Sequence, residues 1–190
     1  MISQEILTGV GRLYVAAVGT AFPAVNATPG ASWRDLGETV DGVTVTPDQT
    51  INEFSTDQRT GPVKATRSEE SLMIETKLAQ NTLENLADVL GNTVTDTPPG
   101  SGTIGTRKVV LTRGFTVDEF AMLFRGNSPY GAWNAQYEVP RGYFGGSQAM
   151  EHTKDGQTSI PVEFHALEDL TASTDGEKFG RLTAQDAAAL

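Results

Sequence analysis

The sequence contains no cysteine, and only two of its 190 residues are histidine and five are lysine. The lack of cysteine excludes a disulfide framework, a thiolate zinc site and a thiol nucleophile. Two histidines, His152 and His165, leave little material for an imidazole metal site. The longest apolar run, residues 13–18, is far shorter than the ~20 residues that span a bilayer as a helix. We therefore expect no metal and no membrane partner.

Basic residues are scarce as well. Lys and Arg total 14 against 24 Asp and Glu, which gives a formal net charge of −10. A nucleic-acid binder needs a basic face to neutralise phosphates, so this balance argues against that class. The N-terminal residues lack the basic and then apolar pattern of a signal peptide, and we expect a soluble protein made in the cytoplasm.

Threonine and glycine are abundant instead, with 24 and 20 residues. Both residue types, together with many short apolar runs, favour strands and turns, so we expect a mainly β fold. A loop with Pro and Gly is expected at residues 20–32. Strands are expected at residues 11–18, 43–46, 63–78, 108–112, 119–125, 133–139, 147–152 and 159–167.

One of these strands is unusually long. Residues 63–78 contain no Gly or Pro, and the run is well above the usual five or six residues of a strand. Leu72, Ile74 and Leu78 share the face expected to be buried, and Ser71, Met73, Glu75 and Lys77 share the other face. A turn signal at Asp41-Gly42 precedes the strand at 43–46, and the polar run 52–61 predicts an exposed loop. Residues 43–78 therefore predict a long, protruding β-hairpin with a polar tip.

The period changes directly after the hairpin. Apolar residues recur at helical spacing over residues 79–90, and Gly91 follows where a helix-ending glycine belongs. We expect this one helix to pack on the outside of the sheet through Leu83, Leu86 and Leu90.

Two segments show no core pattern. Residues 92–106 contain Pro98-Pro99 and several glycines, which predicts a mobile loop or linker. Residues 171–190 are polar and then rich in alanine, which predicts a disordered tail or an arm that docks only on a partner. We therefore expect one domain, residues 1–170, followed by this C-terminal segment.

Motifs that carry chemistry find little support. Residues 100–105, GSGTIG, match the dinucleotide-binding pattern in letters, but prolines precede them and a strand pattern follows, where that site needs a strand and then a helix. The pairs Glu69-Glu70 and Glu168-Asp169 point to opposite faces if they lie on strands. His152 and His165 could form a cross-strand pair without a third ligand. We expect no catalytic residue and no cofactor.

Several short motifs are weak signals one by one, but their order and spacing along the chain are specific. They are GRLYVAAVGT at residues 11–20, WRDLG at 33–37, GPVKATRSEE at 61–70, IETKL at 74–78 leading into the helix, FRGNSP at 124–129 and IPVEF at 160–164. In order and spacing, residues 11–170 resemble the major tail tube proteins of long-tailed bacteriophages.

This resemblance implies a β-sandwich or barrel-like core with one flanking helix. It implies hexameric rings that stack into a hollow tube, in which the long hairpins form an inner barrel that genome DNA passes through. It also implies a place in the virion tail, with the tape measure, terminator and baseplate proteins as partners. An overlong hairpin fits that role, because closing several hairpins into a shared barrel removes their exposed edges. The negative net charge fits as well, because an acidic wall repels phosphates and lets DNA slide.

The hairpin supplies two sets of candidate site residues. The loop at its tip is expected to contact the next ring through Asn52, Glu53, Asp57, Gln58, Arg59 and Gly61. The polar face of its strands is expected to line the lumen through Thr44, Thr46, Glu69, Ser71, Glu75 and Lys77.

Two other classes of function stay open at this point. A monomeric carbohydrate-binding or adhesin-type β-sandwich would use Trp33, Trp133 and the tyrosines as platforms for sugars. An acid/base hydrolase on a β fold would need separate carboxylates that converge in space. The carbohydrate-binding or adhesin-type module does not explain the overlong strand or the single helix after it.

Overall fold

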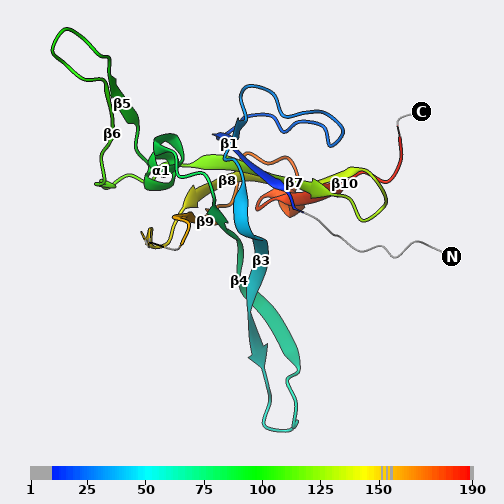
Figure 1. The fold of residues 1–190 in the computed structure, drawn as a ribbon. Helices are drawn as coiled ribbons and strands as arrows, with labels where there is room; N and C mark the ends of the chain where they lie inside the picture. The colour runs from blue at the N-terminus through cyan, green and yellow to red at the C-terminus, as the bar shows by residue number, and fades with distance from the viewer. Residues whose placement is uncertain (1–9, 151, 153, 155, 189–190) are drawn as a thin grey trace.

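A computed structural model describes residues 10–150, 152, 154 and 156–188, and it has the expected mainly β fold with one helix (Figure 1). The elements in chain order are β1 Arg12–Ala17, β2 Arg34–Asp35, β3 Thr39–Phe54, β4 Lys64–Leu78, α1 Leu83–Leu90, β5 Val94–Thr97, β6 Thr106–Val109, β7 Phe120–Asn127, β8 Asn134–Phe144, β9 Ile160–Ala166, the 3-10 turn η1 Asp175–Glu177 and β10 Arg181–Ala184.

Eight of the strands form one antiparallel sheet in the order β2-β1-β7-β8-β9-β4-β3, with β10 joined to β8. Strand β8 has β7 on one side and changes partner on the other: residues 135–138 pair with β10 and residues 142–144 pair with β9. Pro140 lies between these two stretches, where it has no N–H to offer either partner. Strand β3 is the last strand of the sheet, so its outer edge is open in the single chain.

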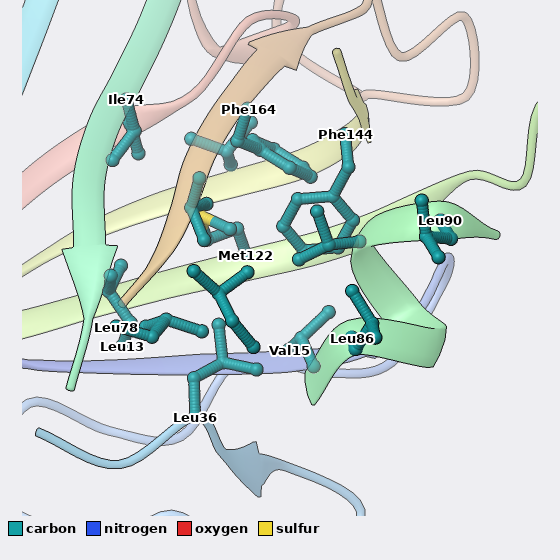
Figure 2. Close-up of a cluster of buried hydrophobic side chains, with 14 residues drawn as sticks. Leu13, Val15, Leu36, Ile74, Leu78, Leu86, Leu90, Met122, Phe144 and Phe164 are labelled. Atoms are coloured by element: carbon teal, nitrogen blue, oxygen red, sulfur yellow. The ribbon is translucent and has the colours of Figure 1, made fainter. Parts of the chain in front are cut away.

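The main core lies on one face of this sheet. Leu13, Met122 and Phe164 are fully buried there beside Ile74 and Leu78 of the hairpin's base. Figure 2 shows Leu86 and Leu90 reaching from α1 into the same cluster. The opposite face is covered by the loop before β2, where Trp33 packs on Phe22 with ring centroids 5.0 Å apart.

The helix begins four residues later than expected. Thr82 is its N-cap and accepts the N–H of Asn85. Ala79, directly after β4, instead donates its N–H to the carbonyl of Glu38. Gly91 ends the helix with a positive φ of 66°, as its position in the sequence predicts. The first turn of the expected helix is therefore chain that connects β4 to α1.

Truncating Leu86 to alanine is expected to lower the free energy of unfolding by about 2–3 kcal/mol, because the side chain is 8% exposed and packs in the core. Leu83 is only partly buried, so Leu83→Ala is the matched control and is expected to cost less. Urea unfolding of both variants measures the difference. Equal, small losses would contradict this packing of the helix.

Three other expectations differ from the structure. Residues 92–106 are not a loop throughout, because β5 and β6 pair as a second hairpin within them. The strand expected at 108–112 ends at Val109, and the described residues between 147 and 152 form no strand. Among the described residues, no neighbouring strand offers backbone hydrogen bonds to residues 110–112 or to the segment between 147 and 152, so these apolar segments do not form strands.

The C-terminal segment also differs from a disordered tail or an arm docked only on a partner. Strand β10 pairs with β8 of its own chain, and Arg181 bonds the buried carboxylate of Glu138 at 2.5 Å. Nothing in the polar sequence of this segment indicates that partner, because Glu138 lies 43 residues earlier in the chain.

Candidate assembly surfaces

The long hairpin extends well beyond the part of it that pairs with the rest of the sheet. Strands β3 and β4 pair from Thr39 opposite Leu78 to Phe54 opposite Lys64, but β9 pairs with β4 only from Met73 to Leu78. Beyond that point the hairpin leaves the body of the protein as a two-stranded ribbon, as Figure 1 shows.

This distal ribbon is exposed throughout. Residues 47–54 and 64–71 are all solvent-exposed, including Ile51 at 49% and Phe54 at 52%. An isolated two-stranded hairpin is marginally stable in water, and each open edge invites another strand. The ribbon therefore presents two open edges and two open faces to a partner.

Two irregularities shape the hairpin. The expected turn at Asp41-Gly42 is instead a bulge inside β3, where Val40 opposes Lys77 and Val43 opposes Thr76. Asp41 and Gly42 both have positive φ, the conformation that makes this pair a turn signal, but the ladder continues on either side. The hydroxyl of Thr76 donates to the carbonyl of Gly42 at 2.6 Å and fixes the bulge.

The second irregularity lies in the ribbon, between Thr50 and Ile51 of β3, opposite Ser68. Next to Ser68, the side chain of Arg67 donates to the side chain of Gln49 on β3 at 2.7 Å. Arg67 also pairs with Glu70 on its own strand, β4. The bond from Arg67 to Gln49 joins the two strands of the exposed ribbon beside this irregularity. Sequence reasoning missed these bonds, because their only signal is a bulge that changes which side chains share a face.

The register assigns the candidate lumen residues to one face. Thr44 opposes Glu75 and Thr46 opposes Met73, so these side chains project from the same side of the hairpin. Glu69, Ser71 and Lys77 lie on that side of β4, and Leu72, Ile74 and Leu78 lie on the other. Thr46 is half-buried and the other five candidates are exposed. Lys77 is paired with Asp41 at 3.0 Å, so its charge is balanced locally.

The tip of the hairpin is shorter than the expected loop. Asn52 and Glu53 lie in β3, opposite Thr66 and Ala65, and the loop proper follows Phe54. The N–H of Val63 donates to the carbonyl of Phe54 at 2.8 Å and closes the ladder. The remaining candidates are exposed side chains or backbone of this loop, namely Asp57, Gln58, Arg59 and Gly61.

The second hairpin, β5–β6, extends from the body on a different side from β3–β4 (Figure 1). Arg107 anchors it, because this guanidinium bonds Glu84 of α1 at 2.6 Å and Asp96 of β5 at 2.8 Å. The pKa of the Glu84 carboxyl lies below its ordinary value, first because a backbone N–H at the start of α1 bonds it and then because of Arg107. The GSGTIG motif forms the turn of this hairpin with no helix after it, so the geometry is wrong for a pyrophosphate.

The residues that the sequence offered for a metal site do not come together in the structure. His165 stacks on Tyr143 and bonds Glu163 at 2.7 Å, whereas His152 lies in a loop beside Thr158, so the suggested cross-strand histidine pair is wrong. Among the described residues no three metal-ligating side chains gather, and no helix there is long and apolar enough to cross a membrane. The surfaces that stand out are the two projecting hairpins.

Residues 2–178 match the family described as phage tail tube protein. The chain belongs to that family. No curated protein sequence matches the chain.

Membership of the tail tube family gives this chain a structural role in the phage tail and implies that it assembles with other tail components. The match covers the body of the protein, both hairpins and the start of the C-terminal segment. The long hairpin is thus part of a protein whose role in the tail is structural.

Proposed function

We propose that this chain forms hexameric rings that stack into a hollow tail tube, and that genome DNA passes through the tube into the host. The distal ribbon of β3 and β4 carries this proposal, because it is exposed on both faces and both edges. Hairpins from neighbouring subunits can pair edge to edge, and closure into a barrel leaves no edge open. The shared barrel supplies the stability that one ribbon lacks.

In this barrel the polar face of the hairpin lines the lumen. Its apolar face continues into the core of its own subunit through Ile74 and Leu78, which supports turning the polar face inward. Glu69 and Glu75 then repeat around each ring, while Lys77 is balanced by Asp41. Acidic walls repel phosphates, so the DNA slides through without specific binding.

The tip of each hairpin contacts the neighbouring ring. Asp57 and Arg59 offer both signs of charge there, and each pair contributes little alone but is repeated around the ring. The outer surface of the tube is left to the helix and to the loops. The tape measure protein in the lumen and the terminator and baseplate proteins at the ends complete the tail. Subunits are made in the host cytoplasm, and the chain has no enzymatic role.

The alternative is a monomeric carbohydrate-binding or adhesin-type module. It loses its principal platform, because Trp33 is only 6% exposed and its indole N–H bonds the carbonyl of Ala21. Trp133 is half-buried. A monomeric module also does not account for a long exposed ribbon whose strand edges are open.

Negative-stain microscopy of the purified protein at high concentration tests the proposal. We expect the protein to form rings and tubes on its own, because the proposed contacts are all between copies of this chain. The rings are expected to show the six-fold symmetry proposed above. Isolated particles at every concentration would contradict the proposal and favour the monomeric module.

A further inference from the structure

The arm formed by β5, β6 and the chain up to residue 117 is unusual in composition. Its exposed apolar side chains include Leu111 at 72% and Phe115 at 107% exposure. Ile104, Val110 and Val117 are exposed on the same segment, at 79%, 49% and 63%. A soluble protein rarely leaves such a set open unless it is a contact surface.

The charge of this arm is also opposite to that of the chain. The arm, residues 94–117, contains Arg107, Lys108 and Arg113 and a single acidic residue, Asp96, which pairs with Arg107, in a protein of net charge −10. Arg107 is used to anchor the arm to α1. Within the described part of the chain, Lys108 and Arg113 form no ion pair, so two cations are left for a partner. The arm is therefore apolar and basic, and it fits an apolar and acidic surface.

The same chain carries such a surface elsewhere. A groove of about 750 Å³ lies between the base of the long hairpin and the strands β8 and β10. Its apolar lining includes Val45, Leu72, Phe179 and Leu182, and Leu182 is 52% exposed. Charged residues also line the groove, but Arg67 pairs with Glu70 and Arg181 pairs with Glu138. Asp48 is the lining carboxylate left without a cation among the described residues, and it accepts only the neighbouring N–H of Gln49.

We infer that the β5–β6 arm of one subunit docks in this groove of a second copy of the chain. The arm lies beyond α1, and β10 lies on the other side of the molecule, so one subunit can offer its arm and receive another at the same time (Figure 1). Such a head-to-tail contact closes into a ring or propagates along a filament. Lys108 or Arg113 meets Asp48, and Leu111 and Phe115 cover the apolar lining. The inference rests on the proposed tube, and it supplies a contact that the barrel of hairpins does not.

Crosslinking between engineered cysteines tests this contact cleanly, because the chain has none of its own. Leu111→Cys and Leu182→Cys subunits are purified separately, mixed under assembly conditions and treated with a flexible bismaleimide. We expect crosslinked dimers in the mixture and none from either variant alone. Leu170→Cys, at a site 74% exposed outside both surfaces, replaces Leu111→Cys as the matched control and gives none.

Two outcomes would overturn the inference: crosslinks from Leu111→Cys alone, which indicate arm-to-arm contact, or equal yields with the Leu170→Cys control. Microscopy of the same samples separates this failure from that of the proposed function. Tubes without the specific crosslink overturn the docked arm alone, whereas isolated particles without crosslinks overturn both. Leu111→Asp adds a second readout, because it is expected to abolish assembly while Leu170→Asp leaves it intact.

Discussion

Deletion of residues 56–60 is expected to leave a folded subunit that no longer forms tubes. The deleted residues are exposed and lie beyond the last pair of the ladder, Phe54 with Lys64, and beyond the N–H of Val63 that bonds the carbonyl of Phe54. Ser55, Gly61 and Pro62 remain to connect the strands, a loop length that antiparallel hairpins accept. The cut therefore removes the surface proposed to reach the next ring without removing packed residues.

Two measurements on the deletion variant check this expectation. Urea unfolding should give the midpoint of the unmodified protein, and negative-stain microscopy should show single rings or free subunits. A control with residues 56–60 replaced by glycine and serine keeps the length of the loop and removes Asp57 and Arg59. Tubes of normal length from the deletion variant would show that the tip has no role in stacking.

Replacing Arg181 with methionine is expected to lower the free energy of unfolding by about 3–4 kcal/mol. Glu138 is 4% exposed, and its carboxylate is held by Arg181 at 2.5 Å and by the amide of Gln136 at 2.5 Å. Without the guanidinium a buried carboxylate keeps a single amide donor, which is a costly state. The value lies in the lower part of the range for broken buried pairs because Arg181 is itself 45% exposed.

A double-mutant cycle isolates this pair. Glu138→Gln removes the charge that Arg181 balances, so adding it to Arg181→Met is expected to recover part of the lost stability. Arg181→Lys keeps the charge but has no planar fork and is expected to lie between the two. Additive losses in the double variant, measured by urea unfolding, would show that the pair is not coupled.

The long hairpin could be predicted because its signals are local. Alternation in β4 identifies the buried face of Ile74 and Leu78, and the length of the strand indicates that it outruns the sheet. The bulge at Asp41-Gly42 gives the same local signal as a turn. Whether these residues form a turn or a bulge depends on the pairing with β4, so the turn predicted from the sequence was wrong.

The elements that sequence reasoning missed depend on distant partners. Strands β5 and β6 have no apolar alternation, and their hairpin is held by Arg107 through Glu84 of α1. Strand β10 is fixed by Glu138 in the middle of the sheet. The helix starts late because Ala79 is bound to Glu38 across the sheet. Such bonds join residues far apart in the chain, which no pattern along the sequence reports. The lumen and stacking residues stay predictions, because a single chain has no neighbour to contact.

Protection of position 75 inside assembled tubes tests most directly whether the long hairpins enclose a channel. Glu75→Cys gives the protein a single thiol on the polar face of β4, and the lost carboxylate is expected not to prevent assembly, because such charges are partly screened. A small maleimide that can enter the channel should label this thiol in free subunits and in tubes. A bulky maleimide that cannot enter should label free subunits only. Equal labelling of both states by the bulky reagent would contradict the account and place this face of the hairpin on the outside of the tube.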